Sequence, residues 1–291
     1  MTYTNSGPIL EKIVGYLGPH GTYSEEVAFC LYQDMKVDFK TYSSIDMAIK
    51  AVESKEVVEC IVPVENSLEG SVNVTLDILA HETTLYIIKE VIWPVRHNLL
   101  VKEKTDSIKV IVSHPQALAQ CRRNLRKLYP EAELRTMNST ADAATLVASG
   151  LENYAAVGSL GAAGIYDLQV MSRDIQDSST NCTRFIVLGN HPANPSSQGK
   201  YKTSLVCQID GTRPGSLCEI LQEFAGRDVN LTRIESRPAR TGLGNYIFFF
   251  DLDGSMEESN VRSAVEAVKA KSLWFKSFGS YPLCMLQNST L

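Results

Sequence analysis

The chain is divided by a stretch that reads Asn-His-Pro-Ala-Asn-Pro-Ser-Ser-Gln-Gly at residues 190–199. Prolines, a glycine and polar side chains interrupt regular structure here, and an apolar run typical of a strand stands on each side. We therefore predict a first domain over residues 12–189, a linker over 190–201 and a second domain over 202–285.

Upstream of this boundary, short apolar runs alternate with helical patterns. Runs typical of strands occur at residues 12–17, 57–62 and 108–112, and a helical pattern occurs at 24–32. A further helix is predicted to present Leu118, Cys121, Leu125 and Leu128 on one face. This alternation is typical of an α/β domain with mainly parallel strands.

A weak internal repeat lies within this first domain. At an offset of 96 residues, Pro19 matches Pro115, Ser43 and Asp46 match Ser139 and Asp142, and Ala48 matches Ala144. Capped helices resemble one another in any protein, so chance similarity stays an alternative. A true repeat predicts two similar lobes, with a cleft at the carboxyl ends of their strands, where such sheets collect ligands.

Downstream of the boundary, the pattern changes to that of a small α+β domain. Strands are predicted at residues 202–209, 229–235, 245–251 and 273–278. One helical stripe carries Leu217, Ile220, Leu221 and Phe224, and a second carries Val261, Ala264, Val265 and Val268. The order is βαββαβ, the ferredoxin-like plan, which alone says nothing about function.

Composition excludes several classes of protein. The 291 residues carry 28 basic and 33 acidic side chains, so no broad positive field attracts nucleic acid or an anionic membrane. The N-terminus lacks a signal-peptide pattern, and no apolar run approaches the roughly 20 residues of a membrane helix. Seven scattered cysteines indicate reduced thiols, and no metal-ligand spacing occurs. We expect a cytoplasmic protein without metal or cofactor.

Three loops at predicted strand ends are rich in small polar residues. They span Gly18–Ser24, Pro63–Ser71 and Ser113–Gln116. In the first loop, Thr22 and Glu25 could form a capping box, which would leave backbone N–H groups at a helix start to receive an anion. Each loop alone is explained by ordinary caps and turns, but three such loops in one domain favour a binding site.

A fourth segment, Asn181-Cys182-Thr183-Arg184-Phe185, places a hydroxyl beside a guanidinium just before an apolar strand. It offers a neutral hydrogen-bond donor and a planar fork that can clamp a carboxylate. No partner in sequence activates Cys182, and His114 before Pro115 is better explained as a helix cap than as a catalytic base. Such a site suits a lyase or a binding protein better than a hydrolase.

Taken together, these four segments resemble those of prephenate dehydratase. In addition, Gly215-Ser216-Leu217-Cys218 and Glu235-Ser236-Arg237-Pro238 resemble the two effector motifs of the ACT regulatory domain in that family. The resemblance runs from about Lys12 to Pro282. It implies a two-lobed, periplasmic-binding-protein-like catalytic domain followed by a ferredoxin-like ACT domain.

The resemblance also implies a function. The family converts prephenate to phenylpyruvate with loss of water and carbon dioxide, and L-phenylalanine inhibits it by binding between the ACT domains of a homodimer or homotetramer. By resemblance, Thr183 hydrogen-bonds the departing hydroxyl and Arg184 clamps a carboxylate. The other substrate-binding residues implied are Phe185, Asn66, Ser67, Glu65, Gly70, Thr22, Ser24, Ser113, His114, Gln116 and Asn181.

The effector-binding residues implied are Gly215, Ser216, Leu217, Asn230, Glu235, Ser236 and Arg237. Ser216 and Cys218 depart from the alanine and the aliphatic residue that are usual in the first effector motif. Two alternatives stay open: an arogenate dehydratase, and a non-catalytic sensor of an amino acid or keto acid. The absence of a transit-peptide pattern disfavours the plastid form of the former, and no helical chorismate mutase segment precedes Lys12.

Overall fold

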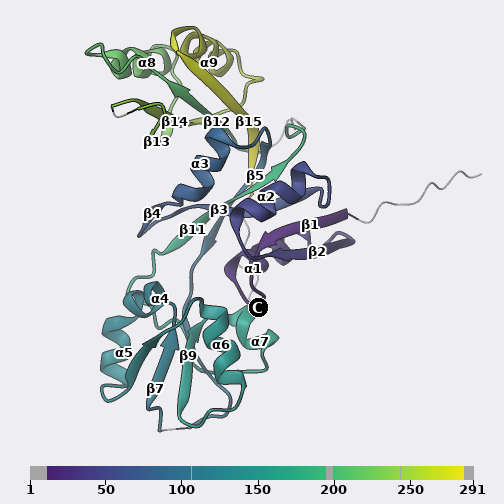
Figure 1. The fold of residues 1–291 in the computed structure, drawn as a ribbon, viewed down its shortest axis with the longest axis vertical. Coiled ribbons are helices and arrows are strands. Elements are labelled where there is room, and N and C mark those ends of the chain that lie inside the picture. Colours follow the sequence, from purple (N-terminus) through teal and green to yellow (C-terminus); the bar gives the residue numbers. More distant parts are fainter. Residues whose placement is uncertain (1–11, 106, 195–198, 243, 285–291) are drawn as a thin grey trace, which may run out of the picture. The chain divides into compact units, whose positions relative to one another are not determined.

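The structure, a computed structural model, describes residues 12–105, 107–194, 199–242 and 244–284 (Figure 1). Residues 195–198 of the expected linker and residues 243 and 285 of the expected second domain lie outside the described residues. The chain forms two compact units. Unit 1 holds the described residues up to Ser71 together with Ile92–Phe185, and unit 2 holds Val72–Val91 together with the described residues from Ile186 onward.

The first lobe of unit 1 is a parallel α/β layer. Its elements are β1 (Lys12–Leu17), α1 (Tyr23–Tyr32), β2 (Val37–Tyr42), α2 (Ile45–Glu53), β3 (Glu59–Asn66) and the short β4 (Gly70–Ser71). β1 pairs in parallel with β2 on one side and with β3 on the other, and β4 turns back onto β3. The start of β11 (Cys182–Gly189) follows β3 in the strand order.

The second lobe of unit 1 repeats this topology. Its elements are β6 (Asn98–Val101), β7 (Val110–Ser113), α4 (Pro115–Gln120), α5 (Arg122–Leu128), β8 (Glu133–Thr136), α6 (Thr140–Ala148), β9 (Tyr154–Gly158), α7 (Leu160–Ile165) and β10 (Gln169–Ser172). β7 pairs in parallel with β8 and β9, as β1 does with β2 and β3. The expected two-lobed α/β fold is confirmed, and the N-caps of α2 and α6, Ser44 and Ser139, lie at the matched positions or beside them.

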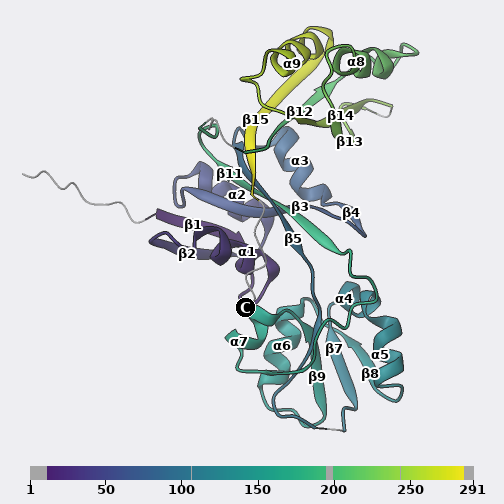
Figure 2. The same ribbon diagram turned by 180° about the vertical axis from the view of Figure 1, so that it is seen from behind.

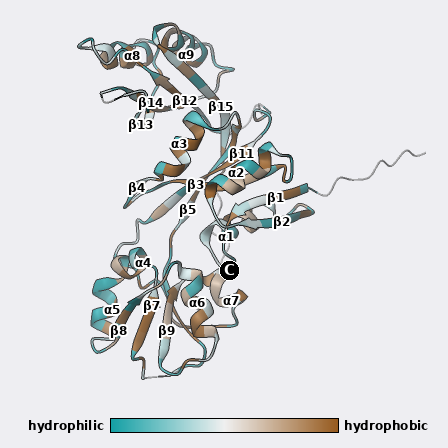
Figure 3. Cartoon of the chain, in the orientation of Figure 1, coloured by the Kyte–Doolittle hydropathy of each residue, from teal (hydrophilic) through white to brown (hydrophobic). Residues whose placement is uncertain are grey.

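Helices cover both faces of the second lobe's sheet (Figures 1 and 2). Ile111 packs with the residues of α4 and α5, whereas Val110 and Val112 pack with those of α6 and α7. Strands covered on both faces are apolar throughout, as the hydrophobic colour of β7 in Figure 3 shows, while the outer α5 is largely hydrophilic. The single helix expected through Leu128 was wrong: Cys121 leaves the helical conformation (φ −110°, ψ 5°), and Leu128 is exposed.

Unit 2 contains the βαββαβ order expected from the sequence. Its elements are β12 (Tyr201–Gln208), α8 (Ser216–Ala225), β13 (Leu231–Pro238), β14 (Tyr246–Asp253), α9 (Ser259–Lys271) and β15 (Trp274–Cys284). The strands pair antiparallel in the order β13-β14-β12-β15, and Phe224 and Val265 of the two helices pack on Phe250. Among the described helices, none combines the length and apolar composition that crossing a membrane requires.

Unit 2 also includes α3 (Asn73–His81) and the first part of β5 (Tyr86–Pro94), which precede the second lobe in sequence. β5 extends the sheet by pairing in parallel with β15. Arg237 donates three hydrogen bonds to the Asp77 carboxylate at 2.9–3.1 Å, and Arg240 donates one at 2.9 Å. The Lys276 ammonium donates to the carbonyls of Leu79 and Thr83. The domain limits expected from the sequence stay predictions, and residues 72–91 pack with the C-terminal elements.

The charge of Asp77 is stabilised in the folded chain. Burial raises the pKa of its carboxyl, but the hydrogen bonds from Arg237 and Arg240 outweigh burial and hold the pKa below the ordinary 3.8. A carboxyl with a lowered folded-state pKa stabilises the fold above its unfolded-state pKa. That contribution is therefore complete at neutral pH and is lost as the pH falls through the folded-state value.

We expect the substitution Asp77→Asn to lower the free energy of unfolding of unit 2 by about 1–3 kcal/mol, because the amide NH2 would face two guanidinium groups. The two tryptophans make this measurable, since Trp93 lies in unit 1 and Trp274 in unit 2. Urea unfolding followed by Trp274 fluorescence in a Trp93→Phe background reports on unit 2. The matched control is Glu219→Gln, which breaks the exposed ion pair with Arg213 and should leave the transition unchanged. Equal transitions for both variants would contradict the expectation.

Candidate active site

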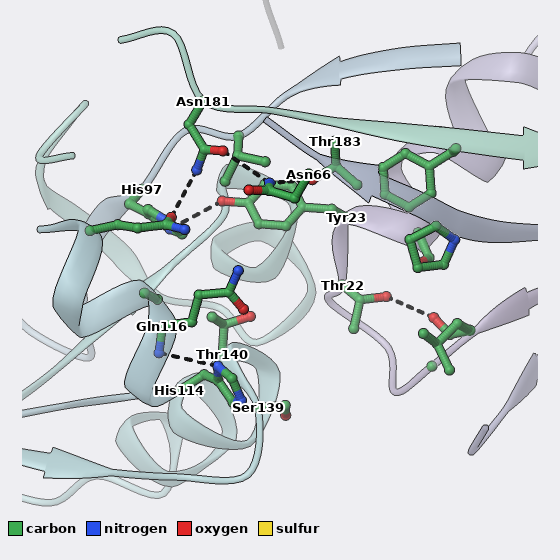
Figure 4. A pocket seen from close by; sticks show the side chains of 18 of the residues that line it. Thr22, Tyr23, Asn66, His97, His114, Gln116, Ser139, Thr140, Asn181 and Thr183 are labelled. Carbon is green, nitrogen blue, oxygen red and sulfur yellow. Dashed lines mark hydrogen bonds between the residues drawn. The ribbon is translucent and has the colours of Figure 1, made fainter. Parts of the chain in front are cut away.

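Unit 1 contains a cavity of about 260 Å³ that is lined by residues of both lobes (Figure 4). Thr22 and Asn66 come from the loop after β1 and the end of β3, and Thr183 comes from the start of β11. Across from them, Gln116 lies in α4 and Thr140 starts α6 (Figure 4). The cavity thus lies at the carboxyl ends of β1, β3, β7 and β8, where parallel sheets place their ligand sites.

Many of the residues predicted from sequence line this cavity. They are Thr22, Ser24, Asn66, His114, Gln116, Asn181, Thr183 and Phe185. The described lining residues include no aspartate, glutamate, lysine or arginine. The wall therefore combines apolar surface with amides, hydroxyls and imidazoles that are available for hydrogen bonding, and it holds no carboxylate, ammonium or guanidinium group among the described residues.

Asn66 and Thr183 form the centre of the polar wall. The Asn66 Oδ1 atom accepts from the backbone N–H groups of Leu68 (3.0 Å) and Glu69 (3.2 Å), so the NH2 group must point the other way. That NH2 group donates to Thr183 Oγ1 at 3.0 Å and to Asn181 Oδ1 at 3.0 Å. The Thr183 hydroxyl accepts a hydrogen bond, and its own proton meets no acceptor among the described residues. It is left to donate to a ligand.

Ser67 ties the same loop to β11 but does not line the cavity. Its backbone N–H donates to the Cys182 carbonyl at 2.9 Å, and its Oγ accepts from the Cys182 N–H at 3.0 Å. Gly70 lies in β4 with φ of +83°, a conformation that glycine adopts without strain. Both residues shape the loop that carries Asn66.

Arg184 and Glu65 lie outside the cavity wall. Side chains alternate along a strand, so Arg184 points away from the face on which Thr183 and Phe185 meet the cavity. Its Nη1 atom lies 3.5 Å from Glu65 Oε2, and its side chain is buried. Arg184 is not among the residues that line the cavity, and the carboxylate-clamp role expected for it stays a prediction.

The capping box expected from Thr22 and Glu25 does not form. Thr22 Oγ1 donates to the Leu17 carbonyl at 3.1 Å instead. The buried Glu25 carboxylate accepts from Tyr16 Oη (2.5 Å) and the Gly21 N–H (2.6 Å), and His20 Nδ1 lies 2.6 Å away. A carboxylate with several acceptor sites is better satisfied by these three groups than by one backbone N–H, and so Glu25 holds the loop after β1 together.

In the third loop, Ser113 and His114 have structural partners. Ser113 is fully buried and donates to the Val157 carbonyl at 2.7 Å, so it does not line the cavity. His114 caps α4, since its Nδ1 accepts from the Gln116 N–H at 3.3 Å. The cap explanation expected from Pro115 agrees with this bond.

Several lining residues were not foreseen from sequence. They are Leu17, Val95, His97, Ala117, Gln120, Asn138, Ser139 and Thr140, whereas Gly18, Tyr23 and Pro63 belong to the loops expected to form the site. His97 follows β5 without any motif around it, and Gln120 ends a helix that had been expected to continue. For Asn138–Thr140, the sequence offered one signal of a site residue, which is their position between a strand and the start of α6.

The residues expected to bind an effector lie in unit 2. Gly215 precedes α8 with φ of +85°, and Ser216 donates to the Arg213 carbonyl at 2.8 Å. Leu217 follows in α8, and Asn230 donates to Asp253 at 2.7 Å. Glu235, Ser236 and Arg237 lie on β13, the outermost strand of the order in this unit, and Arg237 bonds Asp77. The effector-binding roles of these residues stay predictions.

Comparison with known proteins gives two family matches. The family model described as prephenate dehydratase matches residues 14–193, and the ACT domain model matches residues 204–270. A bifunctional chorismate mutase/prephenate dehydratase of Pseudomonas aeruginosa is 39% identical over 276 residues, which are 94% of this chain and 74% of that protein. A prephenate dehydratase of Lactococcus lactis is 36% identical over 276 residues, covering 94% and 98% of the two chains.

A solved structure is also similar. The prephenate dehydratase of Arthrobacter aurescens in complex with L-Phe superposes with a TM-score of 0.85 at 34% sequence identity. The match covers 93% of this chain and 89% of that one.

We expect Glu25→Gln to lower the free energy of unfolding of unit 1 by about 1–3 kcal/mol, because an amide cannot accept from all three of its partners. Urea unfolding followed by Trp93 fluorescence in a Trp274→Phe background measures this. Glu152→Gln, at an exposed residue of the same unit, is the matched control. An unchanged transition for Glu25→Gln would show that the carboxylate does not hold this loop.

Proposed function

The chain belongs to the prephenate dehydratase family, and we propose that its unit 1 cavity converts prephenate to phenylpyruvate. The resemblance drawn from the sequence is confirmed by the two family matches. The protein is a lyase of phenylalanine biosynthesis with an ACT domain. The observation that carries the site assignment is the Thr183 hydroxyl, which accepts from Asn66 and keeps its own proton for a ligand in the cavity.

The reaction requires little chemistry from the protein. The bond between the ring and its carboxylate breaks, its electron pair enters the ring, and carbon dioxide leaves. The ring hydroxyl departs from the opposite carbon with its bonding pair, as hydroxide, and takes up a proton from solvent to become water. Aromatisation of the ring drives these steps. The developing charge on the departing oxygen needs a hydrogen-bond donor, and Thr183 supplies it. The hydrogen bond from Asn66 polarises the Thr183 hydroxyl and makes it a better donor.

The neutral wall suits this reaction. A carboxylate in the cavity would repel the two carboxylates of prephenate, and the described lining residues include none. Neutral donors can hold the carboxylate that stays, and we assign this role to Ser24 and Gln116, because the Thr22 hydroxyl already donates to the Leu17 carbonyl. Phe185 offers an apolar surface for the ring. Loss of carbon dioxide is favoured when the leaving carboxylate is not paired with a cation.

We propose that L-phenylalanine inhibits the enzyme through the ACT domain. The domain itself is shown by the family match over residues 204–270, and the Arthrobacter aurescens structure contains L-Phe. Gly215, Ser216 and Glu235–Arg237 are the proposed effector residues. A homodimer or homotetramer and a cytoplasmic location stay predictions from the sequence.

We expect Thr183→Ala to lower turnover of prephenate by roughly 10²-fold or more, the effect of removing one donor to a transition-state oxygen. Thr183→Ser keeps a hydroxyl and should retain much of the activity. Phenylpyruvate formation at neutral pH against an enzyme-free blank measures both, with arogenate as a second substrate whose product is phenylalanine. Near-normal turnover by a folded Thr183→Ala protein would remove Thr183 from the mechanism. No product from either substrate would favour the sensor function.

We expect L-phenylalanine to slow the full-length wild-type enzyme and D-phenylalanine to have little effect. Gly215→Ala should raise the L-phenylalanine concentration for half-inhibition, because alanine at φ of +85° is strained by about 1 kcal/mol and would shift the start of α8. Rates at increasing effector concentration measure this, and sedimentation gives the oligomeric state. Identical inhibition curves for wild type and Gly215→Ala would place the effector elsewhere.

A further inference from the structure

A chain of side-chain hydrogen bonds leads from Thr183 to a buried histidine that no motif indicated. The Asn66 NH2 group donates to Thr183 and to Asn181 Oδ1, both at 3.0 Å. Asn181 Nδ2 donates to Gln120 Oε1 at 2.8 Å, and His97 Nε2 lies 2.8 Å from the same oxygen. All five residues line the cavity, and Figure 4 shows Asn181 between His97 and Asn66.

Asn66 is held by the backbone at one end of this chain, and its orientation determines which group is the donor and which the acceptor in each following hydrogen bond. Asn66 Oδ1 is held by the N–H groups of Leu68 and Glu69, so its NH2 group faces Asn181. Asn181 must then turn its oxygen to Asn66 and its NH2 group to Gln120. Gln120 must then turn its oxygen toward the NH2 group of Asn181. The same oxygen faces His97 Nε2, so this nitrogen must be a hydrogen-bond donor.

His97 therefore carries its proton on Nε2. A bare Nε2 would face the Gln120 oxygen and repel it. Turning the Gln120 amide over would bring its NH2 group against that of Asn181, and turning Asn181 over would bring two NH2 groups together at Asn66. Turning the Asn66 amide over cannot remove this clash, because the backbone N–H groups of Leu68 and Glu69 hold its oxygen in place.

The environment of His97 suits the neutral ring. The side chain is buried, and burial lowers the pKa of the imidazole below the ordinary 6.5, although the hydrogen bond with Gln120 opposes this. In the neutral Nε2–H form, Nδ1 is an acceptor. The Tyr23 hydroxyl lies 3.3 Å from Nδ1 and 2.7 Å from the Arg96 carbonyl, and its one proton can be given to either of these acceptors. The His97 backbone is held as well, since its N–H donates to Gln176 Oε1 at 2.9 Å.

Building on the proposed dehydratase function, we infer that His97 is a positioning residue for the reaction. Its Nε2–H holds the Gln120 oxygen from one end of the chain, while Asn66 fixes Asn181 from the other, so that both acceptor oxygens stay turned toward their donors. The two protons of the Asn66 NH2 group then point to Asn181 Oδ1, Thr183 Oγ1 and the Cys182 carbonyl. The imidazole gives up no proton during the reaction and touches no reacting atom. It fixes the orientation of the amides beside the catalytic hydroxyl.

Two substitutions separate positioning from packing. His97→Phe keeps a ring but removes one of the two donors to Gln120 Oε1, so the orientation of Gln120 and Asn181 rests on Asn66 alone, and kcat should fall by about tenfold with little change in KM. His97→Gln carries an amide NH2 near the position of Nε2 and should recover most of the lost kcat. His191→Gln, at an exposed histidine, is the matched control. Thermal unfolding of each variant tests folding.

A spectroscopic measurement on the wild-type protein tests the tautomer directly. Long-range proton–nitrogen correlation spectra of protein labelled with ¹⁵N-histidine distinguish Nε2–H from Nδ1–H, and the His97→Gln spectrum assigns the His97 signals among the five histidines. We expect His97 to be neutral with its proton on Nε2.

A proton on Nδ1 in the neutral wild-type ring would overturn the inference, as would wild-type kcat in His97→Phe. If His97→Gln lost as much kcat as His97→Phe, the histidine would only pack, and the inference would also fail. Wild-type protein that forms no phenylpyruvate would instead overturn the proposed function, and the tautomer measured in it would still support or overturn the hydrogen-bond chain.

Discussion

The backbone fixes one carboxamide, and the site depends on it. Because the Leu68 and Glu69 N–H groups hold the oxygen of Asn66, its two amide protons can point only toward β11. From this constraint follow the accepting role of the Thr183 oxygen and the orientation of Asn181. A hydroxyl that accepts a hydrogen bond from a fixed donor becomes more acidic and has one direction left for its own proton. A threonine, a weak acid in water, is in this way prepared to stabilise a departing oxygen.

The same arrangement explains why the cavity works without charge. Asparagine, glutamine and threonine side chains need strict orientation, because turning one amide over exchanges a donor for an acceptor. The protein supplies that orientation through bonds between segments that lie far apart in sequence, from Asn66 and His97 to Gln120 and Asn181. The cavity is thus preorganised by its polar network, whereas many enzymes that bind anions rely on arginine or a metal ion.

Sequence patterns predicted the fold well where burial sets them. Covered parallel strands are apolar throughout, and the turn from α/β to βαββαβ patterns at residues 190–199 showed where the architecture changes. Sequence patterns did not predict hydrogen bonds for which a side chain has several possible partners in the fold. Glu25 could cap α1 in sequence terms, but in the fold Tyr16 and the Gly21 N–H satisfy it. The Thr183 and Asn66 segments were found because they end or begin strands, whereas His97 and Gln120 acquire their roles only through contacts between distant segments.

The position of α3 limits how this chain could be recombined with others. The helix is encoded between two segments of unit 1, yet its Asp77 and the carbonyls of Leu79 and Thr83 are satisfied by Arg237 and Lys276 of the C-terminal elements. A chimera that joined residues 12–189 to a foreign regulatory module would leave an acidic group and two carbonyls without these cations. We therefore expect exchange of the regulatory module to succeed most readily between chains that have both the acceptors around α3 and the cations of the C-terminal elements. The catalytic and regulatory regions should then be inherited together.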